Sequence, residues 1–503
     1  MMCVGMFMAI LDVQVVATSL PTIQGALHIP RNEMSWIQTG YLIAEVVAIP
    51  LTGFLTRLLT MRWLFVVTIA FFTIASIGCA ASENFFALMS WRILQGFSGG
   101  TLIPAVFSAV FLLFPHRLQG VATTIGGVLA VLAPTVGPVV GGWITQTYSW
   151  HWLFLINVAP GIVSAVAASR LLPADRPEPG QARLIDLVSI GCMALALTTL
   201  EIALKEAPDR GWFSPLVGGL FVISIISGAG FARRTLRRSV PLIELRTLGD
   251  PRFAAGCVFS FVLGVGLFGS VYMMPVFLAF ARGHDALEIG TTMLVTGVAQ
   301  LATAPVAVAL ERRVDARWLT AAGFAVFALG LAMSAFETPQ TDFAGMFWPQ
   351  IVRGVAIMFC LLPPTRMALG HLPPAAVPDA SGLFNLMRNL GGAIGIALID
   401  SILYGRAPVI SQTIVHRLQA GDIETAKFVG IPLQMFRHRA AGPLDPDTMA
   451  ILQVMVRHAA FVRAMNEAWT MAALITVTAL LCLPLAKIPN PGGCQALRGN
   501  RTR

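Results

Sequence analysis

Roughly fourteen apolar segments, each close to the length of a membrane-spanning helix, dominate the chain. A helix needs about 20 mostly apolar residues to cross the roughly 30 Å hydrocarbon core of a bilayer. Hydrophobic residues occupy 56% of the 503 positions and charged residues only 12%, whereas soluble domains carry about 25% charged residues. The sequence therefore predicts an all-α membrane protein.

The positions of charged residues, cysteines and histidines argue against a nucleic-acid-binding protein, a metalloprotein and a disulfide-rich protein. The net charge of +9 comes from basic residues in short links between apolar runs, which is typical of cytoplasmic loops and not of a nucleic-acid interface. The seven cysteines have no metal-ligand or disulfide spacing, and the histidines at 28, 116, 151, 284 and 371 fall in or near links, which makes a metal site improbable. No GxxxxGK(S/T) phosphate loop is present, so ATP is not expected to supply the energy directly. We expect no cofactor, no metal site and no enzymatic activity.

The apolar segments form two sets of six with a pair between them. We expect an N-terminal six-helix bundle in residues 1–171, a linking segment with two extra helices in 172–252, a C-terminal six-helix bundle in 253–486, and a cytoplasmic tail in 487–503. The first helix is expected to end at Pro21. A long polar insertion at about 404–462 precedes the last span, and from Asp447 onward it has a helical pattern that runs into that span.

Basic residues in short loops predict the orientation, because such loops stay on the cytoplasmic side. One set of alternating loops holds Arg57, Arg62, Arg117, Arg170, Arg176, Arg183, the Arg233–Arg252 cluster, Arg312, Arg313 and Arg317. The opposite loops hold only Arg31, Lys205, Arg210 and Arg282. Both termini are therefore expected in the cytoplasm, with the 404–462 insertion outside. No basic region precedes the first apolar run, so it is interpreted as a retained span, and a start upstream of Met1 stays open.

Two stretches of the chain repeat at one offset. WRILQGFSGGTLIP, FPHRLQ and GGVLAVLAPTVG resemble WPQIVRGVAIMFCLLPP, LPPAAV and LMRNLGGAIG in the second half. The matching positions are Gly96 with Gly354, Pro115 with Pro373 and Gly137 with Gly395. Two related halves fit a transporter whose site lies between them near the middle of the membrane.

Few ionisable residues lie inside the predicted spans. They are Asp12, Glu45, Arg92, Arg353, Arg388, Asp400 and Glu467. A charge at the bilayer centre costs at least ~2.5–3.5 kcal/mol on insertion scales. Protonation removes most of this cost for a carboxylate, so a buried acid that faces a cavity is suited to carrying a proton across. One proton moving down a potential of 100 mV supplies about 2.3 kcal/mol, which can drive another solute uphill.

Asp12 and Glu45 are the candidates for proton coupling, with Arg92 as their partner. Each acid is either a proton site or an anionic contact for a cationic substrate, or it is neutralised by a structural arginine or by helix-end amides. Arg92 either takes part in the coupling or ties helices together through carbonyl groups. Asp400 and Glu467 lie near the outer boundary, where a structural role is favoured.

Polar side chains at helical spacing predict the wall of a substrate cavity. Gln38, Tyr41 and Glu45 share one helix face, and Asn385 and Arg388 share another. Arg388 either binds an anionic group, pairs with an acid or, as is slightly favoured, ties two helices together. The full set of cavity candidates is Gln14, Gln38, Tyr41, Gln95, Asn385 and Arg388.

Small residues cluster on one otherwise apolar helix, at Gly137, Pro138, Gly141 and Gly142. Small residues let helix backbones approach closely, and a proline frees a carbonyl group and can kink the helix. We expect these four residues to form a tight interface that opens and closes as a gate.

Four motifs resemble those of the major facilitator superfamily, specifically its fourteen-span drug:proton antiporters of the EmrB/QacA type. LDVQVVATSLP is similar to the family's first-helix signature, and RILQGFSGG to its fourth-helix motif RxxQGxgxg, with Arg92 at the arginine. APTVGPVVGGW is similar to the fifth-helix motif GxxxGPxxGG, with Ala133 replacing the first glycine, and INVAPG from Ile156 to the element FINVPIG. The loop GFLTRLLTMR keeps Gly53 and Arg57 of the pattern GxLaDrxGrr but lacks its acid and second glycine.

The resemblance implies the major facilitator fold, with two six-helix bundles, two linking helices, and alternating access coupled to inward proton flow. It places proton coupling at Asp12 and gives Arg92 a part in it. The long outer insertion is similar to the EmrB branch. Members of that branch work with a periplasmic membrane-fusion adaptor and an outer-membrane channel, which are carried over as expected partners.

We interpret the sequence as a proton-driven exporter of small amphipathic toxic compounds, antibiotics among them, in the bacterial inner membrane. The acids would favour cationic substrates. Two alternatives stay open: a metabolite uptake or export facilitator of the same fold, and a non-transporting membrane sensor. Compound accumulation in a deletion strain separates export from uptake, and a phenotype that is insensitive to an uncoupler favours a sensor.

Overall fold

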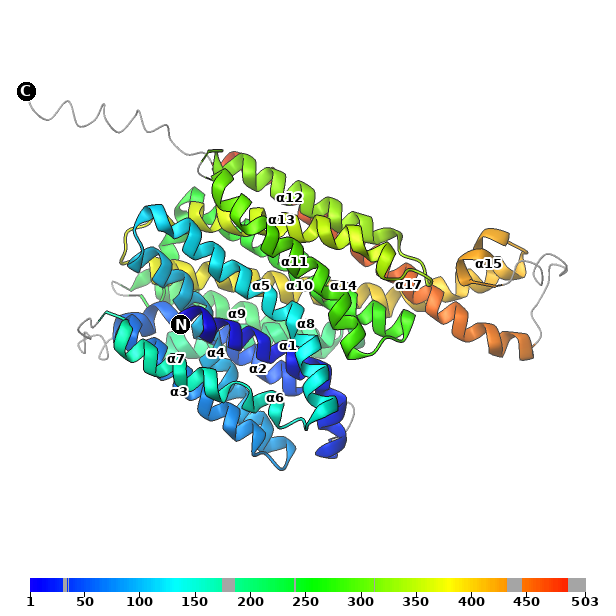
Figure 1. The fold of residues 1–503 in the computed structure, drawn as a ribbon, viewed down its shortest axis with the longest axis horizontal. Coiled ribbons are helices and arrows are strands. Elements are labelled where there is room, and N and C mark those ends of the chain that lie inside the picture. Colours follow the sequence, from blue (N-terminus) through cyan, green and yellow to red (C-terminus); the bar gives the residue numbers. More distant parts are fainter. Residues whose placement is uncertain are drawn as a thin grey trace, which may run out of the picture.

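The computed structural model describes residues 1–29, 34, 36–173, 186–238, 241–311, 313–431 and 446–486, and these residues form helices joined by short turns (Figure 1). Twelve helices in this part of the chain are long and apolar enough to cross a membrane, and the apolar stretch Met2–Ala17 is shorter. One of the twelve, Trp36–Ala80, has 45 residues. As a continuous helix it would measure about 68 Å, more than twice the hydrocarbon thickness, so it holds two passes.

The N-terminal half contains α1 (Met2–Ala26), α2 (Trp36–Ala48), α3 (Thr52–Ala80), α4 (Phe85–Leu113), α5 (His116–Thr147), α6 (Trp152–Leu155) and α7 (Val158–Leu171). The linking pair is α8 (Leu187–Arg210) and α9 (Pro215–Arg237). The C-terminal half contains α10 (Pro251–Arg282), α11 (Ala286–Glu311), α12 (Ala316–Met333), α13 (Phe343–Leu369), α14 (Val377–Gln419), α15 (Ile423–Val429) and α17 (Pro446–Thr478).

Local sequence explains where these helices break and begin. Thr60 has φ 69° and ψ 158° inside α3, so the chain leaves the helical conformation within the predicted link between the second and third spans. Asn84 caps α4 by accepting a hydrogen bond from the Ala87 amide at 2.9 Å. Asp250 caps α10 in the same way, and Pro251 occupies the first helical position, where no amide donor is needed.

Two predicted boundaries are wrong. The first helix does not end at Pro21 but continues to Ala26, because a membrane helix tolerates a proline where neighbouring groups satisfy the freed carbonyl. The span before the 404–462 insertion, expected near 380–403, also continues further: α14 runs on to Gln419, and α15 follows it. The predicted helix from Asp447 into the last span is confirmed by α17. Arg31, Arg176, Arg183, Arg312 and the tail from 487 lie outside the described residues.

The two halves pack by the same plan, as the repeated sequence predicts. α4 packs on α2 and α13 packs on α11, while α5 packs on α1 and α14 packs on α10. Gly96 of α4 lies against the Tyr41 carbonyl of α2, and Gly354 of α13 lies against the Thr296 carbonyl of α11. A side chain at either glycine would overlap that backbone, so the glycines permit the close approach.

The linking helices lie against the bundle and not apart from it. α8 and α9 pack on each other, and α8 also contacts α2 of the first half and α14 of the second (Figure 1). The Trp212 indole, just after α8, donates a hydrogen bond of 2.8 Å to the Ser401 hydroxyl of α14. α8 therefore covers the seam between α2 and α14, and α9 packs on α8.

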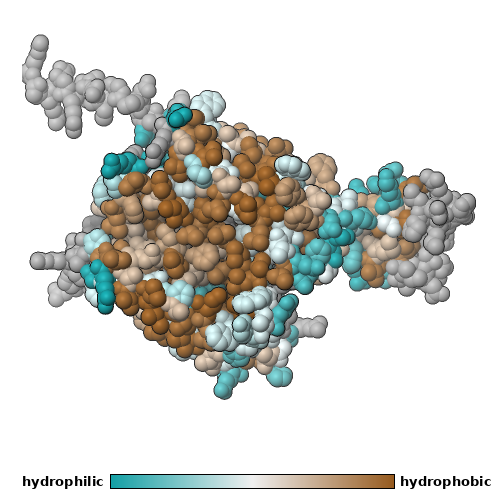
Figure 2. Space-filling model, viewed as in Figure 1, coloured by the Kyte–Doolittle hydropathy of each residue, from teal (hydrophilic) through white to brown (hydrophobic). Residues whose placement is uncertain are grey.

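The outer surface matches a lipid environment. Figure 2 shows a broad hydrophobic surface over the helical body, with hydrophilic residues gathered at its ends and on the projecting part formed by α14, α15 and α17. Large apolar side chains such as Phe86, Leu171 and Val163 face outward on this body. The chain is a multi-pass membrane protein.

Candidate functional site

A buried polar cluster surrounds Asp12 of α1, which is 1% exposed. The Arg92 guanidinium of α4 donates to Asp12 Oδ2 and forms an ion pair with it. Gln95 Nε2 donates to Asp12 Oδ1 at 2.9 Å, and Asn157 Nδ2, at the start of α7, donates to the same oxygen at 2.8 Å. The carboxylate thus joins three helices through three donors.

Arg92 makes further contacts through Nη1, Nε and the face of its guanidinium group, and it is 0% exposed. Its Nη1 also donates to Gln95 Oε1 at 2.8 Å, and its Nε donates to the Ile37 carbonyl at 3.3 Å. The guanidinium carbon lies 4.4 Å from the centroid of the Tyr41 ring, a cation–π distance. Tyr41 in turn donates its hydroxyl to the Ala9 carbonyl at 3.1 Å. The cluster therefore connects α1, α2, α4 and α7.

Burial gives this ion pair its importance. Removing one partner of a buried pair leaves an uncompensated charge, which costs about 3–5 kcal/mol, whereas removing both can be neutral. A proton that neutralises Asp12 would have the same effect as losing its charge. The arrangement fits both interpretations of Arg92, as a coupling partner and as a tie between helices.

Sequence reasoning missed Asn157 as a member of the cluster. The sequence did point to this residue, because Asn157 is the asparagine of the INVAPG element near the start of the sixth apolar segment. Ser76 of α3 was missed too, and its hydroxyl accepts a 2.9 Å hydrogen bond from Gln95 Nε2. A single serine or asparagine in an apolar run gives no indication of its partner, so only the fold connects them to Asp12.

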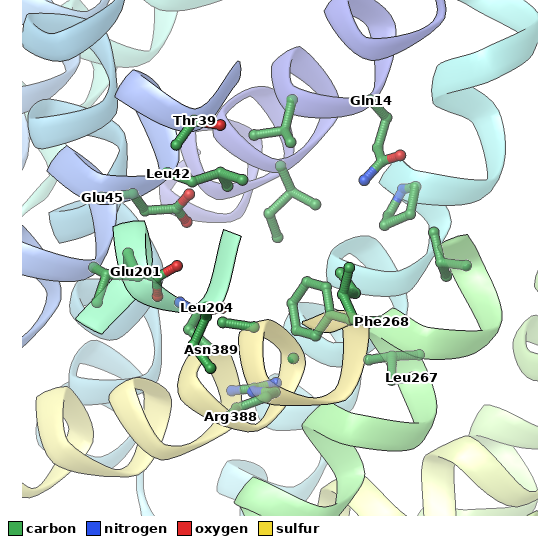
Figure 3. Close-up of a pocket in the computed structure, with 18 of the residues that line it drawn as sticks. Gln14, Thr39, Leu42, Glu45, Glu201, Leu204, Leu267, Phe268, Arg388 and Asn389 are labelled. Carbon is green, nitrogen blue, oxygen red and sulfur yellow. The ribbon is translucent and has the colours of Figure 1, made fainter. Parts of the chain in front are cut away.

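A cavity of about 280 Å³ lies between the two halves (Figure 3). Both halves and the linking helix α8 contribute to its wall. Its charged and polar lining residues are Gln14, Thr39, Glu45, Glu201, Lys205, Asn385, Arg388, Asn389 and Asp400, and the rest of the wall is mainly apolar. Such a mixture suits an amphipathic small molecule with a few oriented polar groups.

The predicted cavity residues divide between the two sites. Gln14, Asn385 and Arg388 line the cavity, and so does Glu45. Tyr41 and Gln95 belong instead to the buried cluster around Asp12. Gln38 was expected beside Glu45 from the helical spacing, but it lies neither in the cavity wall nor in the cluster around Asp12. The spacing shows that two residues share a helix face, but not which other helix that face packs against.

Arg388 and Asp400, which α14 contributes to the cavity wall, each have a partner nearby. Arg388 Nη2 donates to Asn385 Oδ1, and its guanidinium carbon lies 5.5 Å from the centroid of the Phe107 ring. Asp400 Oδ1 accepts a 2.6 Å hydrogen bond from the Tyr272 hydroxyl. Outside the cavity, Glu467 forms a two-bond ion pair with Arg406, at 2.8 and 3.1 Å. These contacts agree with a structural role for Asp400 and Glu467.

One member of the glycine and proline cluster of α5, Gly137, lies at a helix contact. A Cβ at Gly137 would overlap Cβ of Gln14 on α1, so the absence of a side chain permits this packing. Pro138 lies inside α5, and Gly141 and Gly142 are buried. The Gly141 carbonyl accepts a 2.7 Å hydrogen bond from Thr145.

The two halves are also joined where α14 begins. Arg57 of α3 forms a 2.7 Å ion pair with Asp379 and donates to the Leu242 carbonyl at 3.1 Å. The Glu244 amide donates to the same Asp379 carboxylate at 3.2 Å. One carboxylate thus joins the first half, the linking segment and the second half at this end of the bundle. Arg57, which the loop GFLTRLLTMR shares with the family pattern, therefore has a partner far away in the sequence.

The part of the chain that the structure describes contains no group of three or more His, Cys, Asp or Glu side chains placed to hold a metal ion. Arg353, the remaining buried arginine named from the sequence, has its guanidinium carbon 4.7 Å from the centroid of the Trp469 ring. Its Nη2 lies 3.4 Å from the Met274 sulfur. It packs inside the C-terminal half and does not line the cavity.

Comparison with known proteins gives the family. The model of the major facilitator superfamily matches residues 2–396. The colistin resistance protein EmrB of Acinetobacter baumannii is 38% identical over 403 residues, which cover 80% of this chain and 79% of that protein. The multidrug export protein EmrB of Escherichia coli K12 is 28% identical over 80% of this chain and 78% of its own length.

Two further comparisons cover almost the whole chain. The fatty acid resistance protein FarB of Neisseria gonorrhoeae is 26% identical over 97% of this chain and 95% of its own length. The crystal structure of the human organic anion transporter MFSD10 has a TM-score of 0.58 at 14% identity, covering 96% of this chain and 97% of that one, which supports the fold alone. With its paired six-helix halves and the match over residues 2–396, the chain belongs to the major facilitator superfamily and is a transporter, not an enzyme.

Proposed function

We propose that the protein is a proton-coupled exporter of amphipathic toxic compounds in the bacterial inner membrane. The observation that carries this proposal is the buried ion pair of Asp12 with Arg92, beside a central cavity with unpaired carboxylates. The relatives named for multidrug export and for colistin resistance support the direction of transport. Proton coupling accords with the family that the chain belongs to.

In this mechanism a proton from the outer side reaches Asp12 and neutralises it. Arg92 then loses its counter-charge but keeps the Ile37 carbonyl and Gln95 as acceptors. The contacts among α1, α4 and α7 that depend on the carboxylate weaken, and the halves can re-pack around the cavity. Release of the proton to the inner side restores the ion pair, so each cycle moves one proton inward as the cargo moves outward. Glu45, inside the cavity, is the second candidate for protonation.

Replacing Asp12 with Asn tests this mechanism. Asn keeps the size of the side chain and an oxygen that accepts from Asn157, but it carries no proton. We expect the Asp12→Asn protein to insert normally and to lose efflux driven by a pH gradient in reconstituted vesicles, while equilibrium exchange of substrate continues. Full gradient-driven efflux in this variant would contradict a coupling role for Asp12.

The expected topology and partners rest on two features. We expect both termini in the cytoplasm and the end of α14 in the periplasm, because basic loops stay on the cytoplasmic side. With 43 residues α14 is about 64 Å long, so it extends well beyond the hydrocarbon core. Together with α15 and α17 it forms a projecting part that suits contact with a periplasmic membrane-fusion adaptor, which leads to an outer-membrane channel (Figure 1). Loss of resistance on deletion of the adaptor gene, with unchanged transport in vesicles, is the expected result.

A further inference from the structure

The linking helix α8 carries a carboxylate into the transport cavity. Glu201 lies on α8 and lines the cavity together with Glu45 of α2, and Figure 3 shows both side chains on the same side of it. Because α8 belongs to neither six-helix half, Glu201 is outside the repeated core of the fold. Its position near the end of an apolar run, four residues before Lys205, makes it look like a boundary residue in the sequence.

The expected local partner of Glu201 is occupied elsewhere. A glutamate and a lysine four positions apart on a helix commonly pair. Here the Lys205 amine lies 3.8 Å from the centroid of the Trp36 ring on α2, and no ion pair joins it to Glu201. Within the described residues Glu201 Oε1 is buried and has no hydrogen-bond partner. A buried carboxylate oxygen in this condition is costly unless a ligand satisfies it.

Glu45 is in a similar condition on the facing helix. It is buried, and none of the ion pairs or side-chain hydrogen bonds found among the described residues involves it. The cavity's other charged groups are already engaged: Arg388 with Asn385, Asp400 with Tyr272, and Lys205 with Trp36. Two unpaired carboxylates therefore face one apolar cavity, and the group that would satisfy both is a positive charge on an apolar body.

We propose that Glu201 of the linking helix is a specificity-determining residue, which with Glu45 forms a two-carboxylate site for organic cations. This inference deepens the proposed export function and rests on it for the identity of the cavity. The linking pair is then part of the substrate site, not only a connection between two halves. Neutral amphipathic compounds use the same apolar wall without needing either carboxylate.

The test is equilibrium binding of tetraphenylphosphonium, a permanent organic cation, to the purified full-length protein in detergent. N-phenyl-1-naphthylamine serves as the uncharged probe. We expect Glu201→Gln to weaken tetraphenylphosphonium binding about tenfold, roughly the loss of one charge contact, and to leave binding of the uncharged probe within about twofold. Glu45→Gln should act in the same direction, because its carboxylate faces the same space.

Glu206→Gln is the matched control on the same helix. Glu206 pairs with Arg210 and does not line the cavity, so its removal should change neither probe's affinity. Equal tetraphenylphosphonium affinity in the parent and Glu201→Gln proteins, or equal weakening of both probes, would overturn the inference. Because binding needs no gradient, this result is separate from the vesicle experiment on Asp12: failure of gradient-driven efflux in the parent protein would remove the proposed function and leave the binding result standing.

Discussion

At the scale of single residues, the charges inside the membrane are arranged in two different ways. Asp12 and Arg92 neutralise each other in a site without solvent contact, whereas Glu45 and Glu201 face a cavity without a partner. A paired charge is stable but must be disrupted before it can move a proton. An unpaired carboxylate is available at once to a positively charged ligand or to a proton.

The Asp12 pair leads to a prediction about stability. Asp12→Asn should lower the free energy of unfolding by about 3–5 kcal/mol, because Arg92 stays buried without a counter-charge. Adding Arg92→Gln removes that charge and should recover most of the loss. Thermal melting of the two proteins in detergent measures both effects. If the double variant is less stable than Asp12→Asn, the arginine's contacts with Ile37 and Tyr41 matter more than its charge.

Asn157 has its own expected effect. Its amide donates to Asp12 Oδ1, and Asn157→Leu removes this donor while keeping a similar volume. We expect a loss of about 1–3 kcal/mol in unfolding free energy, the cost of leaving a buried acceptor short of a partner. The melting temperature measures this cost, and Ser164→Ala on the same helix α7 is a control that does not touch Asp12. An unchanged melting temperature in Asn157→Leu would remove Asn157 from the cluster.

Much of the candidate site was predictable at this scale. Asp12, Arg92 and Gln95 were all named from their place in apolar runs, and they form one cluster. Glu201 was not named, because a glutamate near the end of an apolar run has the same local sequence whether it faces lipid headgroups or a cavity. The packing of α8 against α2 and α14, which local sequence does not encode, decides between the two.

At the scale of helices, close contacts depend on glycines in both halves. Gly137 on α5 lies against Gln14 on α1, and the matching Gly395 on α14 lies against Val265 on α10. The repeat in the sequence predicted this pairing of positions, although not the helices that they would meet. Helix ends were less predictable, as α1 and α14 show, because a proline or a polar residue does not end a helix whose carbonyls find other donors.

Gly137→Leu tests the contact of α5 with α1. The added side chain would overlap Gln14, which lines the cavity, so we expect transport to fall at least about tenfold, since a misplacement of roughly 1 Å can have that effect. Gly218→Leu on α9 makes the same change where no atom lies within 4 Å, and it should transport normally. Vesicle efflux, corrected for the amount of inserted protein, compares the two. Normal efflux by Gly137→Leu would mean that the contact is dispensable.

At the scale of the whole molecule, Arg57 and Asp379 join the two halves across 322 positions of sequence. Arg57→Asp places two acids in contact and should reduce transport strongly, because like charges at this distance repel. Combining it with Asp379→Arg restores an opposite pair and should recover part of the activity. Recovery stays partial because the Glu244 amide would lose its acceptor. No recovery at all would show that the pair's orientation, not its charge, matters.

Helix packing at the two seams between the halves affects the route by which a compound reaches the cavity. On one flank α8 fills the seam between α2 and α14, and on the other α5 packs along α11, where Gly290 and Gly297 lie against Val139 and Thr135. Molecules dissolved among the acyl chains meet packed helices at both of these seams. They must first return to water and travel along the axis of the bundle, so turnover should follow the aqueous concentration of a compound and not the amount stored in the bilayer.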